Sequence, residues 1–217
     1  KKVRNRRCPA PKEESEDMRK GGVQVTQDFC KKVFAGPSVS LEDMLWARER
    51  RATLQRRLCV YAPSGSSLLS MTLRIPGPHK SSSVFTVVFD SLLSAVNETL
   101  STQRVSNRIR LNEATGPELL ETVECNAFWL KRTMVAVEQF HPLGALVDLD
   151  VFDTGAKQFH LLSRTEIGYP LRTCLVCGGP AKLCARSRAH SVEEMQQCVA
   201  SIIKASLIRE EGLKNYA

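Results

Sequence analysis

Two aspartates, Asp148 and Asp150, stand one residue apart in the otherwise apolar stretch HPLGALVDLDVF, residues 141–152. A carboxylate in such a stretch must find a partner or give up its charge, because removing an unpaired ion from water is costly. Side chains two apart on a strand project from the same face. Two carboxylates on one face suit a hard cation such as Mg²⁺ that bridges substrate phosphates. A solvated strand edge is the alternative explanation.

Three neighbours of the aspartates extend the predicted site. Gly144 would let a phosphate approach the backbone closely. His141 is either a phosphate ligand or proton carrier, or a turn histidine that bonds only to backbone. Glu138 is a third candidate carboxylate, and its direction depends on a hairpin expected between residues 133–140 and 145–152. A four-residue loop turns Glu138 away from the aspartates, whereas a five-residue loop brings it to their face.

A second group of chemically active residues follows the spacing C-x2-C-x6-C-x5-H within residues 174–190. Its members are Cys174, Cys177, Cys184 and His190. Three thiolates and one imidazole complete a closed tetrahedral shell for Zn²⁺, so this site would be structural. The alternative is three reduced thiols beside a surface histidine. A chain of this size does not need disulfides, and clustered thiols indicate a reducing, cytoplasmic environment.

The periodicity of apolar residues predicts the elements that position these groups. Helices are expected at about residues 40–58, 83–100 and 191–209, the first and last beginning with capping boxes. Strands are expected at residues 68–75, 105–111, 133–140, 145–152 and 158–163. Residues 114–117 are expected to turn the chain into a short helix or loop. The predicted fold is α+β, with a mixed, largely antiparallel sheet flanked by helices and a C-terminal Cys/His knuckle.

Length and charge bound the organisation of the chain. The 217 residues predict one catalytic domain at 39–209, after a flexible basic lead-in at 1–38 and before a tail at 210–217. No apolar run is long enough to cross a bilayer, so no membrane association is expected. The net charge of +8 predicts an anionic partner such as phosphates, nucleic acid or an acidic protein. Arg51 and Gln55 share a face of the first helix, which is either a binding surface or a solvated basic face.

Taken together, these stretches resemble the CitX family, the holo-acyl-carrier-protein synthases of citrate lyase. The likeness runs from about residue 40 to residue 195. It rests on RERRATLQ (48–55), IPGPHK (75–80), ATGPE (114–118), EQFHPLGALVDLDV (138–151), and RTCLVC with LCARSRAH (172–190). One departure stands out, because Ala145 occupies a position where the family is expected to have arginine.

The resemblance implies a nucleotidyltransferase-type reaction, and by analogy a nucleotidyltransferase-like architecture. Phosphoribosyl-dephospho-CoA would pass from triphosphoribosyl-dephospho-CoA to a serine of the citrate lyase acyl carrier protein, and pyrophosphate would leave. Mg²⁺ on Asp148 and Asp150 would stabilise the leaving pyrophosphate, while Glu138 or His141 would take the serine proton. The residues that would contact the substrate are Arg51, Gln55, Gly77, Pro78, Lys80, Gly144, Arg164 and Arg172.

Two other functions compete with this transferase. The chain could be a zinc-stapled basic module that binds nucleic acid, or a metal-dependent nuclease, which also requires clustered carboxylates. Aromatic residues suited to stacking on bases are few, and an acidic pair has no role in binding a polyanion. An acidic carrier protein is therefore the expected partner, and nucleic acid is not.

Overall fold

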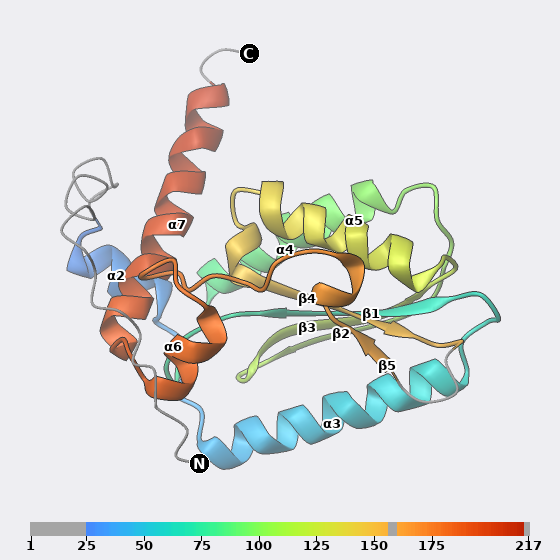
Figure 1. Cartoon of the computed structure of the whole chain (residues 1–217). Helices are drawn as coiled ribbons and strands as arrows, with labels where there is room; N and C mark the ends of the chain where they lie inside the picture. Colours follow the sequence, from blue (N-terminus) through green and yellow to red (C-terminus); the bar gives the residue numbers. More distant parts are fainter. Residues whose placement is uncertain (1–24, 156–159, 215–217) are drawn as a thin grey trace, which may run out of the picture. The chain divides into compact units, whose positions relative to one another are not determined.

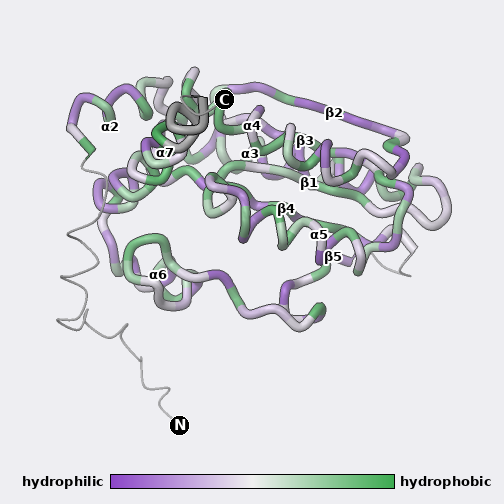
Figure 2. The backbone as a smooth tube through the Cα atoms, turned by 90° about the horizontal axis from the view of Figure 1, so that it is seen from above, coloured by the Kyte–Doolittle hydropathy of each residue, from purple (hydrophilic) through white to green (hydrophobic). Residues whose placement is uncertain are grey.

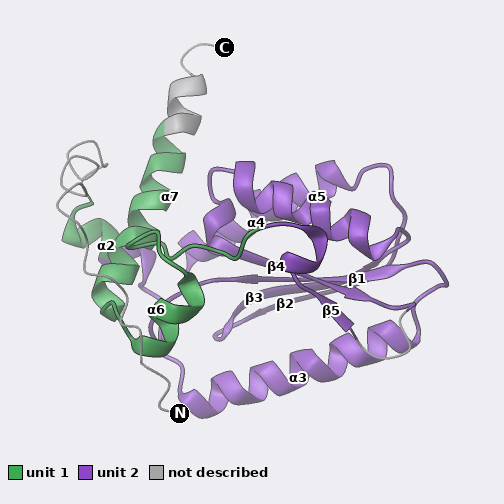
Figure 3. Ribbon diagram, viewed as in Figure 1, with its two compact units in different colours: residues 1–30, 170–217 green, residues 31–169 purple. Residues whose placement is uncertain are grey.

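The computed structural model describes residues 25–155 and 160–214. By internal contacts the chain divides into a larger unit, residues 31–169, and a smaller one made of residues 1–30 and 170–217 (Figure 3). This division lies inside the span predicted as one catalytic domain, and that assignment stays a prediction. Most of the predicted lead-in, residues 1–24, lies outside the described residues.

The larger unit is built on a five-stranded sheet with the order β2-β3-β1-β4-β5 (Figure 1). Its strands are β1 (Ser67–Leu73), β2 (Val105–Glu113), β3 (Gly116–Val123), β4 (Val147–Asp153) and β5 (His160–Leu162). Every pair of neighbouring strands in it is antiparallel. The α+β class and the largely antiparallel sheet are therefore confirmed, while the likeness to nucleotidyltransferases stays a prediction.

Helices cover both faces of this sheet. Helix α3 (Leu41–Val60) runs along one face, and α4 (Ser83–Thr99) and α5 (Ala127–Phe140) pack on the other (Figure 1). The remaining elements are α2 (Gln27–Val33), the 3-10 turns η1 (Gly144–Leu146) and η2 (Thr165–Ile167), and, in the smaller unit, α6 (Ala181–Ser187) and α7 (Val192–Lys214). Both capping boxes are confirmed. The Oγ atoms of Ser40 and Ser191 accept from the backbone N–H groups of Asp43 and Glu194, and the carboxylates of those residues accept from the backbone N–H groups of the serines.

The core lies between the sheet and helices α4 and α5. Fully buried side chains on these elements include Phe85, Phe89, Leu92, Leu130, Met134, Leu69, Met71 and Leu119. Strand β1 is central, and its first five residues are buried on both faces of the sheet, although apolar and polar residues alternate in SLLSMTL from Leu69 onward. Strand β2 at the edge is largely hydrophilic (Figure 2). Val33 and Phe34 are also buried, so the packed chain begins before residue 39.

Residues 133–140 form the second half of helix α5, so the predicted strand and its hairpin are wrong. The run TMVAVEQF is rich in residues that favour strands, but the helix begins at Ala127, upstream of that window. Asn126 caps it, because its Oδ1 accepts hydrogen bonds from the backbone N–H groups of Phe128 and Trp129. A capped helix with one buried face overrides the local strand propensity.

Residues 116–123 form strand β3, where a short helix or loop was predicted. All eight residues are buried, including Glu118 and Glu121. Two glutamates in a central strand obscure the usual alternation. Arg51 pairs with Glu118 and Arg108 with Glu121, and these partners make the burial of both charges tolerable.

None of the helices in residues 25–155 and 160–214 is both long enough and apolar enough to cross a bilayer.

Replacing Asn126 with alanine tests the start of α5. The substitution removes the acceptor for two N–H groups at the helix terminus, so we expect the free energy of unfolding to fall by about 0.5–2 kcal/mol. Urea denaturation measures this loss. Asn112→Ala on the exposed edge of β2 is the control, with an expected change within about 0.5 kcal/mol. Equal stability of the two variants would contradict the capping role.

Candidate functional site

Helix α3 contacts the sheet through polar side chains. Nη1 of Arg51 donates a 2.8 Å hydrogen bond to Oε1 of Glu118 on β3. Nε2 of Gln55 donates a 3.0 Å bond to Oγ of Ser70 on β1. Because Gln55 is buried and Arg51 is largely enclosed, the two residues do not form a solvated basic face.

The register of the sheet places acidic and hydroxyl groups in rows beneath α3. Thr72 on β1 has Glu118 on β3 as one neighbour and Asp148 on β4 as the other. In the adjacent row Ser70 pairs with Asp150. Paired residues in neighbouring strands point to the same side, so both aspartates share the face covered by α3, as predicted. The residues that alternate with them are buried on the opposite face: Val147, Leu149 and Val151.

A pocket of about 210 Å³ lies at the end of this polar face. It is lined by Met44, Arg51, Thr72, Leu73, Ile75, Lys80, Thr115, Gly116, Pro117, Glu118 and Asp148. Two cationic and two carboxylate side chains therefore meet around one small space. Its volume is below the roughly 300–1,000 Å³ of pockets that enclose a drug-sized ligand, so it fits one polar portion of a larger substrate.

The segment IPGPHK, residues 75–80, brings a lysine to this pocket. Gly77 has a φ of 79°, in the left-handed region that favours glycine, and the carbonyl of Pro78 accepts a 3.0 Å bond from Val39 N. Lys80 Nζ donates to the carbonyl of Ile75. Burial lowers the pKa of Lys80. Gly77 and Pro78 shape the turn, and Ile75 and Lys80 at the two ends of the segment line the pocket.

Arg74 lies beside the aspartates, although the sequence had not singled it out. Its Nη1 donates a 3.1 Å bond to the carbonyl of Ala145, and its Nε is 3.7 Å from Oδ1 of Asp148. Asp148 is 41% exposed in its side chain, so solvent screens the pair and it adds little to stability. The contact nevertheless places a guanidinium next to the position where Ala145 replaces the expected arginine.

Glu138 lies on α5, on the opposite side of the sheet from the aspartate side chains. Its Oε1 accepts a 2.9 Å bond from the backbone N–H of Leu149, and its Oε2 pairs with Arg164. The side chain is 1% exposed. Neither hairpin register proposed for Glu138 applies, because helix α5 replaces the first strand. Glu138 is not one of the described residues that line the pocket.

This contact completes the hydrogen bonding of β4. Strand β5 pairs with β4 only from Val151 onward, so among the described residues no strand lies along the outer edge of β4 at Leu149. Side chains of α5 take its place: Glu138 accepts from the N–H of Leu149, and Lys131 Nζ donates a 2.8 Å bond to its carbonyl. The peptide groups between Asp148 and Asp150 are thereby held on both edges.

The HPLG turn connects α5 to this strand. His141 ends the helix, and its Nδ1 accepts a 3.1 Å bond from Leu143 N, which is the backbone-bonding turn role that the sequence left open. Gly144 is buried, and a Cβ on it would lie 2.5 Å from the carbonyl oxygen of Glu138. The turn therefore packs against the helix terminus at a distance that only glycine permits. A role of either residue toward phosphate stays a prediction.

The predicted site residues thus fall into separate groups. The pocket collects Arg51, Lys80 and Asp148, and Gln55 and Asp150 belong to the next row of the same sheet face. Arg164 is engaged with Glu138. Arg172 belongs to the smaller unit, where its carbonyl accepts a bond from Ala181 N.

Glu118 and Thr72 line the pocket but were missed as site residues. Burial raises the pKa of Glu118, while the nearby guanidinium groups of Arg51 and Arg50 act in the opposite direction. Glu118 ends the ATGPE segment and directly precedes two leucines. A charged residue beside apolar ones was the feature of the sequence that could have indicated a site residue. Thr72 gave none, because a threonine that alternates with apolar residues is typical of any strand.

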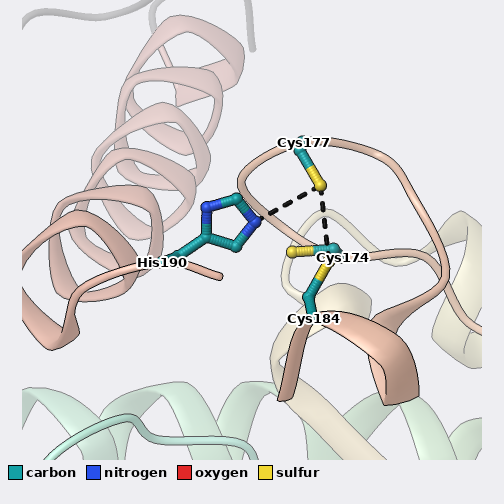
Figure 4. Close-up of side chains that lie close together, drawn as sticks. All are labelled: Cys174, Cys177, Cys184 and His190. Atoms are coloured by element: carbon teal, nitrogen blue, oxygen red, sulfur yellow. Dashed lines mark hydrogen bonds between the residues drawn. The ribbon is translucent and has the colours of Figure 1, made fainter. Parts of the chain in front are cut away.

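The four predicted zinc ligands do come together in the smaller unit (Figure 4). Cys177 Sγ lies 3.5 Å from Cys184 Sγ and 3.3 Å from His190 Nε2, and all four ligand atoms lie within 4.8 Å of one another. Gly178, with a φ of 68°, turns the chain after the first cysteine pair. Within residues 25–155 and 160–214 this is the one group of three or more such side chains arranged to hold a metal ion.

Comparison with known proteins agrees with these motifs. Residues 39–206 match the family described as apo-citrate lyase phosphoribosyl-dephospho-CoA transferase. The chain belongs to the CitX family. The matched region contains the polar sheet face, the pocket and the Cys/His cluster.

Relatives from several bacteria show the extent of this likeness. The probable apo-citrate lyase phosphoribosyl-dephospho-CoA transferase of Streptococcus pyogenes serotype M3 is 40% identical over 176 residues, which cover 81% of this chain and 91% of that protein. The protein of the same name from Vibrio cholerae serotype O1 is 36% identical over 162 residues, 73% of this chain and 88% of its own. Protein CitXG of Haemophilus influenzae is 38% identical over 170 residues, 77% of this chain but 35% of that longer protein.

Glu138→Ala tests how this CitX chain holds its aspartate strand. The variant leaves the charge of Arg164 buried without its carboxylate and the N–H of Leu149 without its acceptor. We expect the free energy of unfolding to fall by about 3–5 kcal/mol, measured by urea denaturation. Glu124→Ala, which breaks the more exposed pair with Arg104, should change it by no more than about 1 kcal/mol. A similar loss in both variants would contradict the assigned role of Glu138.

Proposed function

We propose that this chain transfers the phosphoribosyl-dephospho-CoA group from triphosphoribosyl-dephospho-CoA to a serine of the citrate lyase acyl carrier protein. Membership of the CitX family, described as apo-citrate lyase phosphoribosyl-dephospho-CoA transferases, is the observation that carries the proposal. The pocket supports it, because Arg51 and Lys80 line the same space as Asp148. Cationic side chains around a small polar pocket suit the phosphate chain of the donor.

The proposed reaction is a displacement at phosphorus. The serine hydroxyl oxygen attacks the phosphorus nearest the ribose, an O–P bond forms, and the bond to pyrophosphate breaks. The serine proton passes to a base, and negative charge builds on the leaving pyrophosphate. Arg51 and Lys80 bind and orient the phosphates and stabilise that charge. This chemistry places the enzyme among nucleotidyltransferase-type phosphotransferases.

The acceptor of the serine proton was predicted to be Glu138 or His141. Both oxygens of Glu138 are engaged, by Leu149 and Arg164, and His141 Nδ1 already accepts a backbone bond. Their roles as bases stay predictions. Their observed contacts support a different contribution, which is to hold the strand that carries the aspartates.

Magnesium belongs to the proposal through the chemistry of Asp148 and Asp150. Their carboxylates share a face, and hard oxygen donors of this kind suit Mg²⁺, which takes its other ligands from water and substrate phosphates. When bound there, the ion would supply positive charge to the phosphate chain. The pair alone does not form a complete ligand set, so affinity would depend on the donor.

Zinc is the metal we propose for Cys174, Cys177, Cys184 and His190. Ligand atoms around tetrahedral Zn²⁺ stand about 3.3–3.8 Å apart, given bonds of about 2.0–2.3 Å. The observed separations of 3.5 and 3.3 Å at Cys177 agree with that spacing. Three cysteines and a histidine leave no open position, so the ion would stabilise the fold. Reduced thiols of this kind also favour the cytoplasm as the site of the reaction.

The two competing functions are less well supported. A nucleic-acid-binding module needs a continuous basic surface, yet Arg50 and Arg51 on α3 are paired with glutamates of the sheet. The nuclease has no support among the relatives, whose names describe the transferase. The net charge of +8 is compatible with an acidic carrier protein as the partner.

Asp148→Asn tests the proposed chemistry. Purified protein, donor and apo-carrier protein should release pyrophosphate, and we expect the variant to lose about 10²–10³-fold in kcat because one of the two carboxylates proposed to hold Mg²⁺ is gone. Asp153→Asn is the matched control, since Asp153 lies on β4 but on the opposite face and should retain near-normal activity. Equal rates for Asp148→Asn and wild type would contradict the assignment.

Elemental analysis tests the Cys/His site. We expect one zinc per chain that resists dialysis against a mild chelator, and its loss in Cys177→Ser, because removing one thiolate opens the closed shell. Cys198→Ser is the control, as Cys198 lies in the same unit outside the four-residue cluster. Full zinc content in Cys177→Ser would contradict the site.

A further inference from the structure

The contact between Arg51 and Glu118 joins two residues that both line the pocket. Glu118 is almost completely enclosed, with 4% of its side chain exposed, whereas 22% of the Arg51 side chain is exposed. The buried member of the pair therefore belongs to the rigid sheet, and the accessible member belongs to the helix above it. Arg51 is the one that can reach a ligand.

The contact uses only part of each group. Oε1 of Glu118 accepts from Nη1 of Arg51, while Oε2 is buried and has no hydrogen-bond partner among the described residues. A guanidinium has five N–H donors, and Glu118 engages one of them through this bond. This bond anchors the guanidinium through Nη1, and bidentate binding of a phosphate would use other N–H groups of the same fork.

Burial makes this attachment persistent. Desolvation disfavours the charged form of Glu118, so moving Arg51 away would leave a buried carboxylate without its closest cation. Arg50 also lowers the pKa of Glu118, but its own ion pair is with Glu113 on β2. Arg51 is thus the cation that Glu118 holds at the pocket.

The row of the sheet sets the distance to the aspartate. Glu118 and Asp148 flank Thr72 on adjacent strands, so their backbones are two strand spacings apart, about 9–10 Å. Arg51, Thr72 and Asp148 all line the pocket at this row of the sheet, so a phosphate group held there would lie near both Arg51 and Asp148.

We propose that Glu118 is a positioning residue for the donor's phosphate chain, and that it acts by holding the guanidinium of Arg51 toward the pocket. The inference rests on the proposed function, because it names the part of the substrate that Arg51 would contact. Its effect should appear in the binding of phosphate chains, and it should vanish when Arg51 is absent.

Glu121 provides a matched control on the same strand. It is fully buried, its carboxylate pairs with Arg108, its Oε1 has no hydrogen-bond partner among the described residues, and burial raises its pKa. It points to the opposite face of the sheet, since it pairs with Leu69 while Glu118 pairs with Thr72. A role in stability alone would affect both glutamates alike.

The experiment is a double-mutant cycle on the full chain, read by calorimetric binding of inorganic tripolyphosphate with Mg²⁺. Arg51→Gln should raise the Kd for tripolyphosphate about tenfold or more, because it removes a charged hydrogen bond between the protein and the ligand. Glu118→Gln should produce most of the same increase in Kd. The double variant should bind no more weakly than Arg51→Gln alone, since Glu118 acts only through Arg51. Glu121→Gln should bind like the wild type.

Two outcomes would overturn the inference. Glu118→Gln that binds tripolyphosphate as tightly as Glu121→Gln would show that the carboxylate does not matter for phosphate. Losses that add in the double variant would show that Glu118 acts independently of Arg51. The expected thermal stabilities of Glu118→Gln and Glu121→Gln are similar, so a difference in binding between them is not a difference in folding.

A conservative variant covers the case in which Glu118→Gln does not fold. Glu118→Asp keeps the carboxylate on a shorter side chain, and it should bind tripolyphosphate with a Kd between those of wild type and Arg51→Gln; wild-type affinity would contradict the positioning role. Failure of the proposed function is a separate result. It would appear as absence of pyrophosphate release by the wild type, whereas the cycle depends only on phosphate binding.

Discussion

Side chains of helix α5 form hydrogen bonds with the backbone of Leu149, the residue between the two aspartates. In the described part of the chain no strand pairs with the outer edge of β4 at Leu149, and the side chains of Glu138 and Lys131 bond to the N–H and carbonyl of Leu149 instead. Glu138 is itself fixed by Arg164. These contacts satisfy the outer edge of the strand and support the register that its pairing with β1 sets. A shift by one residue would turn both aspartates to the opposite face, so the polar face beneath α3 depends on this register.

This attachment also explains why the motif is contiguous. The stretch EQFHPLGALVDLDV begins with Glu138, which accepts a hydrogen bond from the strand, and ends with the strand itself. His141 closes the helix, and Gly144 allows the turn to lie against the helix terminus. The chain can then fold back at once, so that Glu138 reaches Leu149. The observed contacts of His141 and Gly144 shape the turn that joins α5 to β4.

The sequence predicted the aspartate face and the Cys/His group because each depends on short spacing along the chain. Side chains two apart on β4 share a face in any sheet, and a compact Cys/His spacing brings thiols together in any knuckle. Helix α5 was missed because its cap, Asn126, lies upstream of the strand-like run. Strand β3 was missed because its glutamates are made tolerable by arginines distant in the sequence, which no local pattern reveals. The pocket was unpredictable for the same reason, since its lining comes from α3, β1, β3 and β4.

Anomalous scattering from crystals grown with Mn²⁺ and pyrophosphate tests the central claim most directly, because it locates a divalent ion relative to the aspartate face. The account predicts a manganese peak bridging Asp148, Asp150 and the phosphate oxygens, with pyrophosphate in contact with Arg51 and Lys80. A fully bound pyrophosphate elsewhere, with no ion at either aspartate, would contradict it.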